Sequence, residues 1–283
     1  MKHDPRIAPD PRTTLWRDGI AARGLEGVMA AEVYLDPQTM SCAAAATAIR
    51  AAPEAGAEQM DQLLFGERFD VIEEEGAWLF GQAVRDGYVG FVEAAALRPA
   101  GGAPTHRVSA LRTYAFAEPS IKSRALGPYS INSLVAVEAV EGKLARVAGA
   151  GWMSAAHLSP IGVFEEDWAA VAERFVGAPY LWGGRESLGL DCSGLVQQAL
   201  FACGRGCPRD TDMQEQMGRP IEAAEFGRGD LVFWKGHVAM GLGDGRIVHA
   251  NGHHMATVVE PLAEAVARIS EAGVGEPTSY RRL

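Results

Sequence analysis

The sequence predicts an α+β chain in which small β barrels precede a domain whose helices come before an antiparallel sheet. Two observations support this prediction. Residues 42–98 contain short strand-like runs separated by turn signals, and part of this pattern recurs about 60 residues later. From about residue 161 onward, apolar residues first follow a helical spacing, and strand-like runs come after them.

The first β module is expected to follow an N-terminal extension. Residues 1–40 carry four prolines and would lie across a neighbouring domain, with a short helical stretch at residues 20–25. Asp86-Gly87 would form a hairpin turn. Many short strands in about 60 residues are typical of a small barrel, which we expect over residues 41–100. The strand-like runs occur at residues 62–67, 69–72, 77–80 and 88–92.

A second β module is indicated by an internal repeat. Residues 90–97 (Gly-Phe-Val-Glu-Ala-Ala-Ala-Leu) align with residues 151–158 (Gly-Trp-Met-Ser-Ala-Ala-His-Leu), with four identical positions at an offset of 61 residues. Chance similarity between two Ala-rich stretches is the alternative. Strand-like runs at residues 133–140 and 144–148 favour duplication of a small β domain, so we expect the second module over residues 101–160.

The third domain is expected over residues 161–283. Apolar residues recur at helical spacing over residues 168–176, and a Gly and a Pro then end this helix. A second helix would open at Cys192 or Ser193 and end at Cys203, before Gly204. Strands are expected at residues 231–234, 237–240 and 247–249.

The composition indicates which binding partners and which cellular compartment to expect. The 283 residues carry 26 Lys+Arg and 36 Asp+Glu, a net charge of -10, which argues against nucleic acid and anionic membranes as partners. Four cysteines are too few for a disulfide scaffold. The polar start lacks the apolar core of a signal peptide, and no apolar run approaches the ~18 residues of a membrane span. We therefore expect a cytoplasmic protein with free thiols.

Cys192 is the strongest candidate nucleophile because it stands where a loop becomes a helix. The first N–H groups of a helix lack partners and its dipole is positive there, so a thiol loses its proton more easily. The same N–H groups can hold an oxyanion. A buried helical cysteine is the alternative. Cys203 fits that alternative well, whereas Cys192 has polar and small neighbours and fits it badly.

Two histidines on neighbouring strands are candidates for the base that such a thiol needs. A two-residue loop after residue 243 would put His237 and His249 on opposite faces of the sheet. A three-residue loop with Gly245 in the left-handed region would pair residue 239 with residue 249 and put both histidines on one face. We predict the three-residue loop.

Two facing histidines could equally be a metal pair. However, no cysteine or carboxylate stands at a zinc-protease spacing from them, so we expect no metal and no cofactor. The adjacent His253 and His254 are expected to be loop residues.

Five motifs in series resemble those of the NlpC-type cell-wall cysteine peptidases, which are papain-like enzymes. The resemblance covers residues from about 165 to 262. The motifs are Tyr-Leu-Trp-Gly-Gly at 180–184, Asp-Cys-Ser-Gly-Leu-Val at 191–196, Gly-Asp-Leu-Val-Phe-Trp at 229–234, Gly-His-Val-Ala-Met at 236–240 and His-Ala at 249–250. The upstream β modules resemble the bacterial SH3-like domains that precede this catalytic domain in one branch of the family.

The resemblance implies a role for each motif residue. Cys192 would be the nucleophile, and His237 would be the general base that later protonates the leaving amine. His249 would be the third member and would fix the tautomer of His237. The Tyr180 hydroxyl would join the Cys192 backbone N–H in the oxyanion hole.

The resemblance also implies the substrate-binding residues. Asp191 and Ser193 would bind the amino end of the substrate, and Trp182 would line the cleft. Asp210 and Thr211 would contact the side of the diamino acid.

The first SH3-like domain would close the cleft through Glu67 and Tyr88, as it does in that branch of the family. For Glu67 the alternative is a solvated charge at a strand end, and for Tyr88 it is a barrel core position. The second module lacks the Asp-Gly-Tyr motif and is expected to be structural.

The implied activity is hydrolysis of the bond between D-glutamate, through its γ-carboxyl, and the following diamino acid of peptidoglycan stem peptides. A free N-terminal L-Ala would be required, because Asp191 and Glu67 would pair with its ammonium group. The partner would be a small wall peptide handled in cell-wall recycling. Two alternatives remain: a related thiol amidase or acyltransferase on the same scaffold, and a wall-peptide binding protein with a dormant site.

Overall fold

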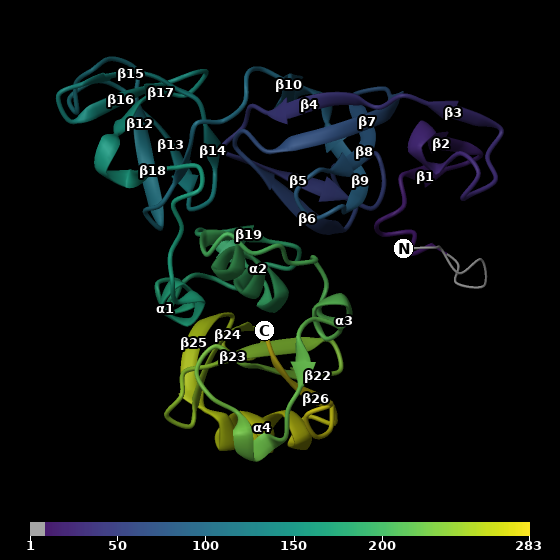
Figure 1. Cartoon of the computed structure of the whole chain (residues 1–283), viewed down its shortest axis with the longest axis vertical. Helices are drawn as coiled ribbons and strands as arrows, with labels where there is room; N and C mark the ends of the chain where they lie inside the picture. The colour runs from purple at the N-terminus through teal and green to yellow at the C-terminus, as the bar shows by residue number, and fades with distance from the viewer. Residues whose placement is uncertain (1–8) are drawn as a thin grey trace. The chain divides into compact units, whose positions relative to one another are not determined.

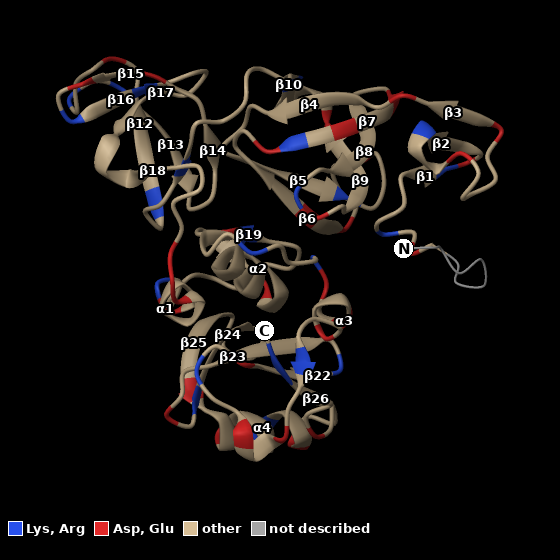
Figure 2. Ribbon diagram, in the orientation of Figure 1, with Lys and Arg blue, Asp and Glu red and all other residues tan. Residues whose placement is uncertain are grey.

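The structure is a computed structural model that describes residues 9–283, and its chain divides into two compact units at Gly102 (Figure 1). The first unit, Met1–Gly102, is built almost entirely of strands. The second unit, Ala103–Leu283, holds further strands and all four α-helices of the described residues. Acidic and basic side chains occur along both units (Figure 2), and most of the net negative charge lies in the first, which has 16 Asp+Glu and 9 Lys+Arg against 20 and 17 in the second.

A small three-stranded sheet opens the first unit. β1 (Trp16–Arg17) pairs antiparallel with β2 (Ile20–Ala22), which pairs in parallel with β3 (Val33–Leu35). The helix predicted at residues 20–25 is therefore wrong, since a strand and a single 3₁₀ turn at Arg23–Leu25 occupy this stretch. Pairing with strands on both sides satisfies the backbone that a helix would otherwise satisfy internally. Residues 1–8 of the predicted extension lie outside the described part.

The remainder of the first unit is one seven-stranded sheet in the order β10-β4-β7-β8-β9-β5-β6. Strands overlap all four predicted runs, although β6 begins before its run and ends at Leu64, β7 is longer than its run, and β4, β5 and β10 were not predicted. The core is apolar and contains Ile49, Leu63, Phe69 and Val92, all at or near zero exposure. The strand bounds are β4 Gln38–Cys42, β5 Ala46–Arg50, β6 Gln59–Leu64, β7 Arg68–Glu75, β8 Trp78–Ala83, β9 Val89–Glu93 and β10 Leu97–Pro99.

The second unit begins with two small sheets, one of three strands and one of five. Their orders are β14-β11-β18 and β13-β12-β17-β16-β15. The bounds are β11 His106–Val108, β12 Arg112–Phe116, β13 Ala125–Ser130, β14 Leu134–Val135, β15 Val137–Glu141, β16 Leu144–Val147, β17 Gly151–Ser154 and β18 Leu158–Pro160.

The two copies of the sequence repeat have the same local structure. In the first unit, β9 runs into a 3₁₀ turn at Ala94–Ala96 and then into β10. In the second unit, β17 runs into a 3₁₀ turn at Ala155–His157 and then into β18. Both turns begin after a residue with extended backbone angles, and they lie 61 residues apart. Identical local conformation at the predicted offset favours duplication over chance similarity.

A six-stranded sheet in the order β21-β26-β22-β23-β24-β25 forms the centre of the last region. Its helices are α1 (Trp168–Glu173), α2 (Cys192–Ala202), α3 (Thr211–Gln214) and α4 (Leu262–Glu271). The strands are β21 Arg219–Pro220, β22 Leu231–Trp234, β23 His237–Gly241, β24 Arg246–Asn251, β25 Ala256–Pro261 and β26 Ser279–Arg282, and a separate two-stranded hairpin holds β19 Arg185–Glu186 and β20 Gly189–Leu190.

The predicted order of helices and then strands is incomplete. α1 ends at Glu173, three residues before the predicted end, and α2 begins and ends where the sequence indicated. α4 and the strands on either side of it, β25 and β26, were not predicted. α4 is needed because β22 and β23 are apolar on both faces and each face requires a cover, whereas β25 and β26 extend the sheet.

The sheet lies between helices on its two faces (Figure 1). Phe233, Val238 and Val248 pack against α1 and α2 in one apolar cluster. Val232 and Trp234, which point the opposite way along β22, pack against Ala265 and Ile269 of α4 in another. All eleven residues of α2 are buried, so this helix is the central element on its side of the sheet.

The strand-rich part of the second unit is fastened to α2. Ile131 belongs to the same apolar cluster as α2. The buried amide of Asn132 donates to the backbone oxygen and to the side chain of Gln198, both at 2.9 Å. Arg112 donates to the backbone oxygen of Ser187, which lies in the loop before α2. Buried bonds of this kind hold two elements in one arrangement, in agreement with the structural role expected for the second module. Within residues 9–283, no helix combines the length and apolar character of a membrane span.

Candidate active site

Cys192 is the first residue of α2 and is 7% exposed. The helix begins here because Asp191 has extended backbone angles and its carboxylate accepts the backbone N–H of Gly194 at 2.7 Å, which is an N-cap. The thiol therefore stands at the start of a helix, as the sequence predicted, but both the helix and Cys192 are buried, which the sequence analysis did not expect.

The loop between β23 and β24 has the predicted three-residue form. Met240 lies opposite Val248, and Leu242 N–H donates to the backbone oxygen of Arg246, so residues 243–245 form the loop. Gly245 has a φ of 78°, the left-handed conformation that this loop requires. This register places His237 and His249 on one face of the sheet.

The two histidines contact each other directly. His237 Nε2 and His249 Nδ1 are 2.8 Å apart, and the ring centroids are separated by 5.1 Å. Because these two nitrogens share one hydrogen bond, they are not positioned as two ligands around a metal ion. The sequence left a metal pair open, and the geometry supports the hydrogen-bonded pair instead.

Cys192 lies where α2 packs on β23, the strand that carries His237. Cys192 and Val238, the residue after His237, belong to one apolar cluster. The backbone of Val238 also bonds to the sulfur and lowers the pKa of the thiol. The first residue of α2 is thus next to the first residues of β23.

The pKa of Cys192 is nevertheless raised to about 11, chiefly because the thiol is buried and secondly because of the negative charge of Asp191. The sequence predicted a lowered thiol pKa at a helix start, and that prediction is wrong because burial outweighs the helix dipole here. Burial likewise lowers the pKa of His237 to about 3, helped by His249 and Arg268. Near neutral pH the free site therefore holds a neutral thiol and a neutral imidazole.

Tyr180 lies close to the nucleophile. Its backbone N–H donates to Met255 and it bridges to Leu190, just before the Asp-Cys pair. Burial raises the pKa of the Tyr180 hydroxyl, and the negative charge of a Cys192 thiolate raises it further. The hydroxyl therefore keeps its proton and is a hydrogen-bond donor, which is what the expected oxyanion role requires.

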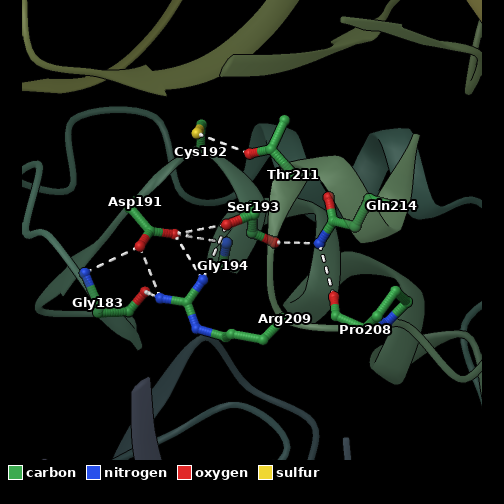
Figure 3. Close-up of polar contacts among 10 residues, drawn as sticks. Gly183, Asp191, Cys192, Ser193, Gly194, Pro208, Arg209, Thr211 and Gln214 are labelled. Carbon is green, nitrogen blue, oxygen red and sulfur yellow. Dashed lines mark hydrogen bonds and ion pairs between the residues drawn. The ribbon is translucent and has the colours of Figure 1, made fainter. Parts of the chain in front are cut away.

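A buried arginine that the sequence analysis missed organises the start of α2 (Figure 3). Arg209, 1% exposed, donates from Nη2 to Asp191 at 2.6 Å and from Nη1 to the Ser193 hydroxyl at 2.8 Å. Asp191 also accepts the backbone N–H of Gly183 at 2.9 Å. A cation next to the predicted Asp210-Thr211 motif was the available signal, since a buried Asp191 needs a positive partner.

This network changes the expectation for Asp191 and Ser193. The carboxylate of Asp191 accepts two backbone N–H groups, the Ser193 hydroxyl and both ends of the Arg209 guanidinium. Its acceptor directions and its charge are used internally, so it does not present a free carboxylate to a substrate ammonium group. Both side chains instead fix the conformation of the loop that carries Cys192.

α3 lies beside Cys192 and the start of α2 (Figure 3). The hydroxyl of Thr211 lies 3.8 Å from the Cys192 sulfur, and Asp210 stands at the N-cap position of this short helix. The Gln214 amide donates to the backbone oxygens of Ser193 and Pro208, at 3.0 and 2.9 Å. Thr211 therefore lies beside the Cys192 sulfur, while contact of Asp210 or Thr211 with a diamino acid stays a prediction.

Trp182 lies in the loop between Tyr180 and α2 and is 59% exposed. A large exposed aromatic side chain two residues from Tyr180 has the position expected of a residue that lines a cleft. Its contact with substrate stays a prediction.

Glu67 and Tyr88 belong to the first unit and are both buried, at 0% and 2% exposure. Glu67 forms an ion pair of 2.6 Å with Arg85 and accepts the backbone N–H of Leu64 at 2.9 Å. The alternative of a solvated strand-end charge is therefore wrong for Glu67, while the buried position of Tyr88 agrees with a core site. A role of either side chain at the cleft stays a prediction.

A further carboxylate lies behind the histidine pair. Glu260 of β25 lies 2.6 Å from His249 Nε2 and accepts a hydrogen bond from Arg268 of α4. His249 stands opposite Val258, so Glu260, two residues along the strand, is its diagonal neighbour on the same face. The sequence analysis missed it because residues 256–261 were not recognised as a strand.

Comparisons with known proteins agree with this geometry. Residues 177–271 match the NlpC/P60 family, and residues 49–97 match the bacterial dipeptidyl-peptidase SH3 domain. The chain is 28% identical over 210 residues to the gamma-D-glutamyl-L-lysine dipeptidyl-peptidase of Bacillus subtilis, covering 67% of this chain and 71% of that protein. It is 41% identical over 91 residues to dipeptidyl-peptidase 6 of Lysinibacillus sphaericus, covering 31% of this chain and 33% of that protein.

The fold is shared with a solved structure over most of its length. An NlpC/P60 family protein from Bacillus cereus superposes with a TM-score of 0.74 at 20% identity, covering 86% of this chain and 99% of that one. A likeness at this identity establishes the fold. The chain therefore carries an NlpC/P60 domain preceded by a bacterial SH3 domain.

Proposed function

We propose that this protein is a cysteine peptidase that hydrolyses the bond between the γ-carboxyl of D-glutamate and the following diamino acid in peptidoglycan stem peptides. The observation that carries the proposal is the contact of a helix-start thiol, Cys192, with a strand whose His237 is hydrogen-bonded to His249. A nucleophile, a base and a residue that orients the base are the parts that acyl transfer to a thiol requires.

The reaction follows from these positions. The Cys192 sulfur attacks the γ-carbonyl carbon while His237 takes the thiol proton, and the carbonyl oxygen becomes an oxyanion. The Cys192 backbone N–H and the Tyr180 hydroxyl stabilise that oxyanion. His237 then gives its proton to the leaving amine, which leaves a thioester. Water attacks the thioester, His237 takes a proton from this water, and the sulfur departs as a thiol.

The choice of bond rests on the relatives. A gamma-D-glutamyl-L-lysine dipeptidyl-peptidase and a second dipeptidyl-peptidase are among them, and the matched SH3 domain is of the dipeptidyl-peptidase type. An enzyme that removes dipeptides acts next to a free amino end. We therefore infer that the substrate begins with a free L-Ala, a group present on released fragments and absent from intact wall polymer, which fits a role in recycling.

Asp191, one of the two carboxylates expected to select the free amine, already pairs with Arg209. Glu67 and Tyr88 of the first unit are the remaining candidates. Glu67 forms an ion pair with Arg85, and we propose that the ammonium group of the substrate would also bind this carboxylate.

Matched peptides test the proposal. We expect cleavage of L-Ala-γ-D-Glu-L-Lys and of its meso-diaminopimelate counterpart. Mass spectrometry of the released diamino acid measures this cleavage. An N-acetylated peptide should be cleaved far more slowly, and an α-linked L-Ala-α-D-Glu-L-Lys peptide should remain intact. Equal cleavage of the acetylated peptide would contradict the free-amine requirement. Transfer of the dipeptide to an added amine, without hydrolysis, would favour an acyltransferase, and binding without turnover would favour a dormant binding protein.

A further inference from the structure

The histidine pair is connected to a charged pair, Glu260 and Arg268, that lies outside the five sequence motifs. Glu260, on β25, lies between His249 and Arg268, and its carboxylate oxygen Oε1 contacts both. All three side chains are largely buried: His249 is 0% exposed, and the side chains of Glu260 and Arg268 are 12% and 24% exposed. A buried carboxylate in line with a catalytic histidine constrains where protons lie.

The charge of Glu260 determines which ring nitrogen of His249 is protonated. Burial alone would raise the pKa of this carboxyl, but the hydrogen bond from His249 and the charge of Arg268 outweigh burial, so the pKa is lowered. An ionised carboxylate only accepts hydrogen bonds. His249 Nε2, 2.6 Å away, must therefore carry a proton, and Nδ1 of the same ring must be the unprotonated nitrogen.

The tautomer of His249 in turn determines which ring nitrogen of His237 is protonated. The unprotonated Nδ1 of His249 lies 2.8 Å from Nε2 of His237, so His237 must donate from Nε2. The lone pair of His237 is then on Nδ1. A neutral imidazole has one donor and one acceptor nitrogen, so each proton placement in this chain of contacts fixes the next.

Asn251 competes with Glu260 for the same nitrogen. Its amide nitrogen lies 3.1 Å from His249 Nε2, and donation from this amide would require the opposite tautomer. The amide orientation is set by its oxygen, which accepts the backbone N–H of His254 at 2.8 Å. A charge-assisted bond of 2.6 Å is roughly twice as strong as a neutral one, so the carboxylate prevails over the amide.

We propose that Glu260, held in place by Arg268, is a positioning residue that sets the tautomers of both histidines and so places the proton-accepting lone pair on Nδ1 of His237. The consequence for catalysis rests on the proposed function. The tautomers themselves can be measured without any substrate.

The sharpest test removes the carboxylate and keeps the volume of the side chain. In the Glu260→Met variant Asn251 remains as the partner of His249 Nε2, so we expect both histidines to change from Nε2–H to Nδ1–H tautomers. Nitrogen-15 NMR of ring-labelled protein distinguishes protonated from unprotonated ring nitrogens. The exposed Glu264 of α4 supplies the matched control, and Glu264→Met should keep the wild-type tautomers.

The reactivity of Cys192 and rescue by Glu260→Asp distinguish a positioning role of Glu260 from a merely structural one. We expect Glu260→Met to lower the alkylation rate of Cys192 by iodoacetamide and to lower kcat by about 10- to 100-fold, as for other residues that orient a functional histidine, with a smaller change in KM. Glu260→Asp keeps a carboxylate and should restore the Nε2–H tautomers and part of the rate.

Two outcomes would overturn the proposal: an Nδ1–H tautomer of His249 in the wild-type protein, or Nε2–H tautomers that persist in Glu260→Met. If Glu260→Met does not fold, the wild-type and Glu260→Asp spectra still decide the question. If wild-type protein cleaves no stem peptide, the proposed function fails, while the NMR and alkylation results continue to test the tautomers.

Discussion

Removal of the Arg209 guanidinium is the most informative single perturbation of the site. The Arg209→Met substitution keeps the buried hydrophobic stem and leaves the carboxylate of Asp191 without its charged partner. Both groups are buried, at 1% and 9% side-chain exposure, and the ion pair is 2.6 Å long. Loss of one partner of a buried pair costs about 3–5 kcal/mol, because an uncompensated charge stays behind.

The remaining contacts place the cost at the lower end of that range. Asp191 would keep the backbone N–H groups of Gly183 and Gly194 and the Ser193 hydroxyl as donors. We therefore expect a loss of about 3 kcal/mol in the free energy of unfolding. For a unit of this size that corresponds to a decrease in Tm of about 6–12 °C. The exposed Arg219 provides the control, and Arg219→Met should change Tm little.

The same substitution should also change the pKa and the reactivity of the Cys192 thiol. The charge of Asp191 already raises the pKa of Cys192, and Arg209 offsets that charge. Alkylation of Cys192 at fixed pH should therefore be slower in Arg209→Met and recover in the Asp191→Asn/Arg209→Met double variant, which removes the unpaired charge. The reasoning is refuted if Arg209→Met retains wild-type Tm and alkylation rate, or if the double variant is no faster than the single one.

The sequence predicted the features that depend on local pattern. The start of α2 at Cys192 followed from a capping residue before an apolar run, and the register of His237 and His249 followed from the glycine positions of one loop. The pKa of Cys192 could not be predicted in this way, because it depends on burial by elements distant in the sequence.

Arg209 and Glu260 were missed for a related reason. Each contacts a partner outside its own segment: Arg209 follows Asp191 by 18 positions, and Glu260 follows His249 by 11. The sequence motifs contain the candidate catalytic residues, whereas the side chains that contact those residues become visible only when the strands and loops are assembled.

The remaining predictions concern stability, specificity and the nucleophile. The folded-state pKa of His237 is about 3 and its unfolded value is 6.5, so between these values the unfolded state binds a proton that the folded state does not. The free energy of unfolding should therefore fall as pH decreases below about 6.5, by about 3 kcal/mol at pH 4.5 for this group. Urea titrations should show a smaller loss in the His237→Gln variant. Trp182→Ala should raise KM for the tripeptide several-fold and leave Tm unchanged, since the side chain is 59% exposed; an unchanged KM would remove it from the cleft. Thr211→Val should change the alkylation rate of Cys192, because its hydroxyl lies 3.8 Å from the sulfur, and an unaltered rate would show that this contact has no effect on the thiol. Cys203→Ala should retain full activity, and loss of activity there would contradict the assignment of Cys192 as nucleophile.

The most direct test of the central claim is the rate of free lysine release from L-Ala-γ-D-Glu-L-Lys by wild-type protein and by Cys192→Ala, measured side by side by mass spectrometry. We expect release by the wild type and a decrease of about 10⁴-fold or more in the variant, as for other enzymes that lose their nucleophile. Lysine release at comparable rates by both proteins, or by neither, would contradict the account.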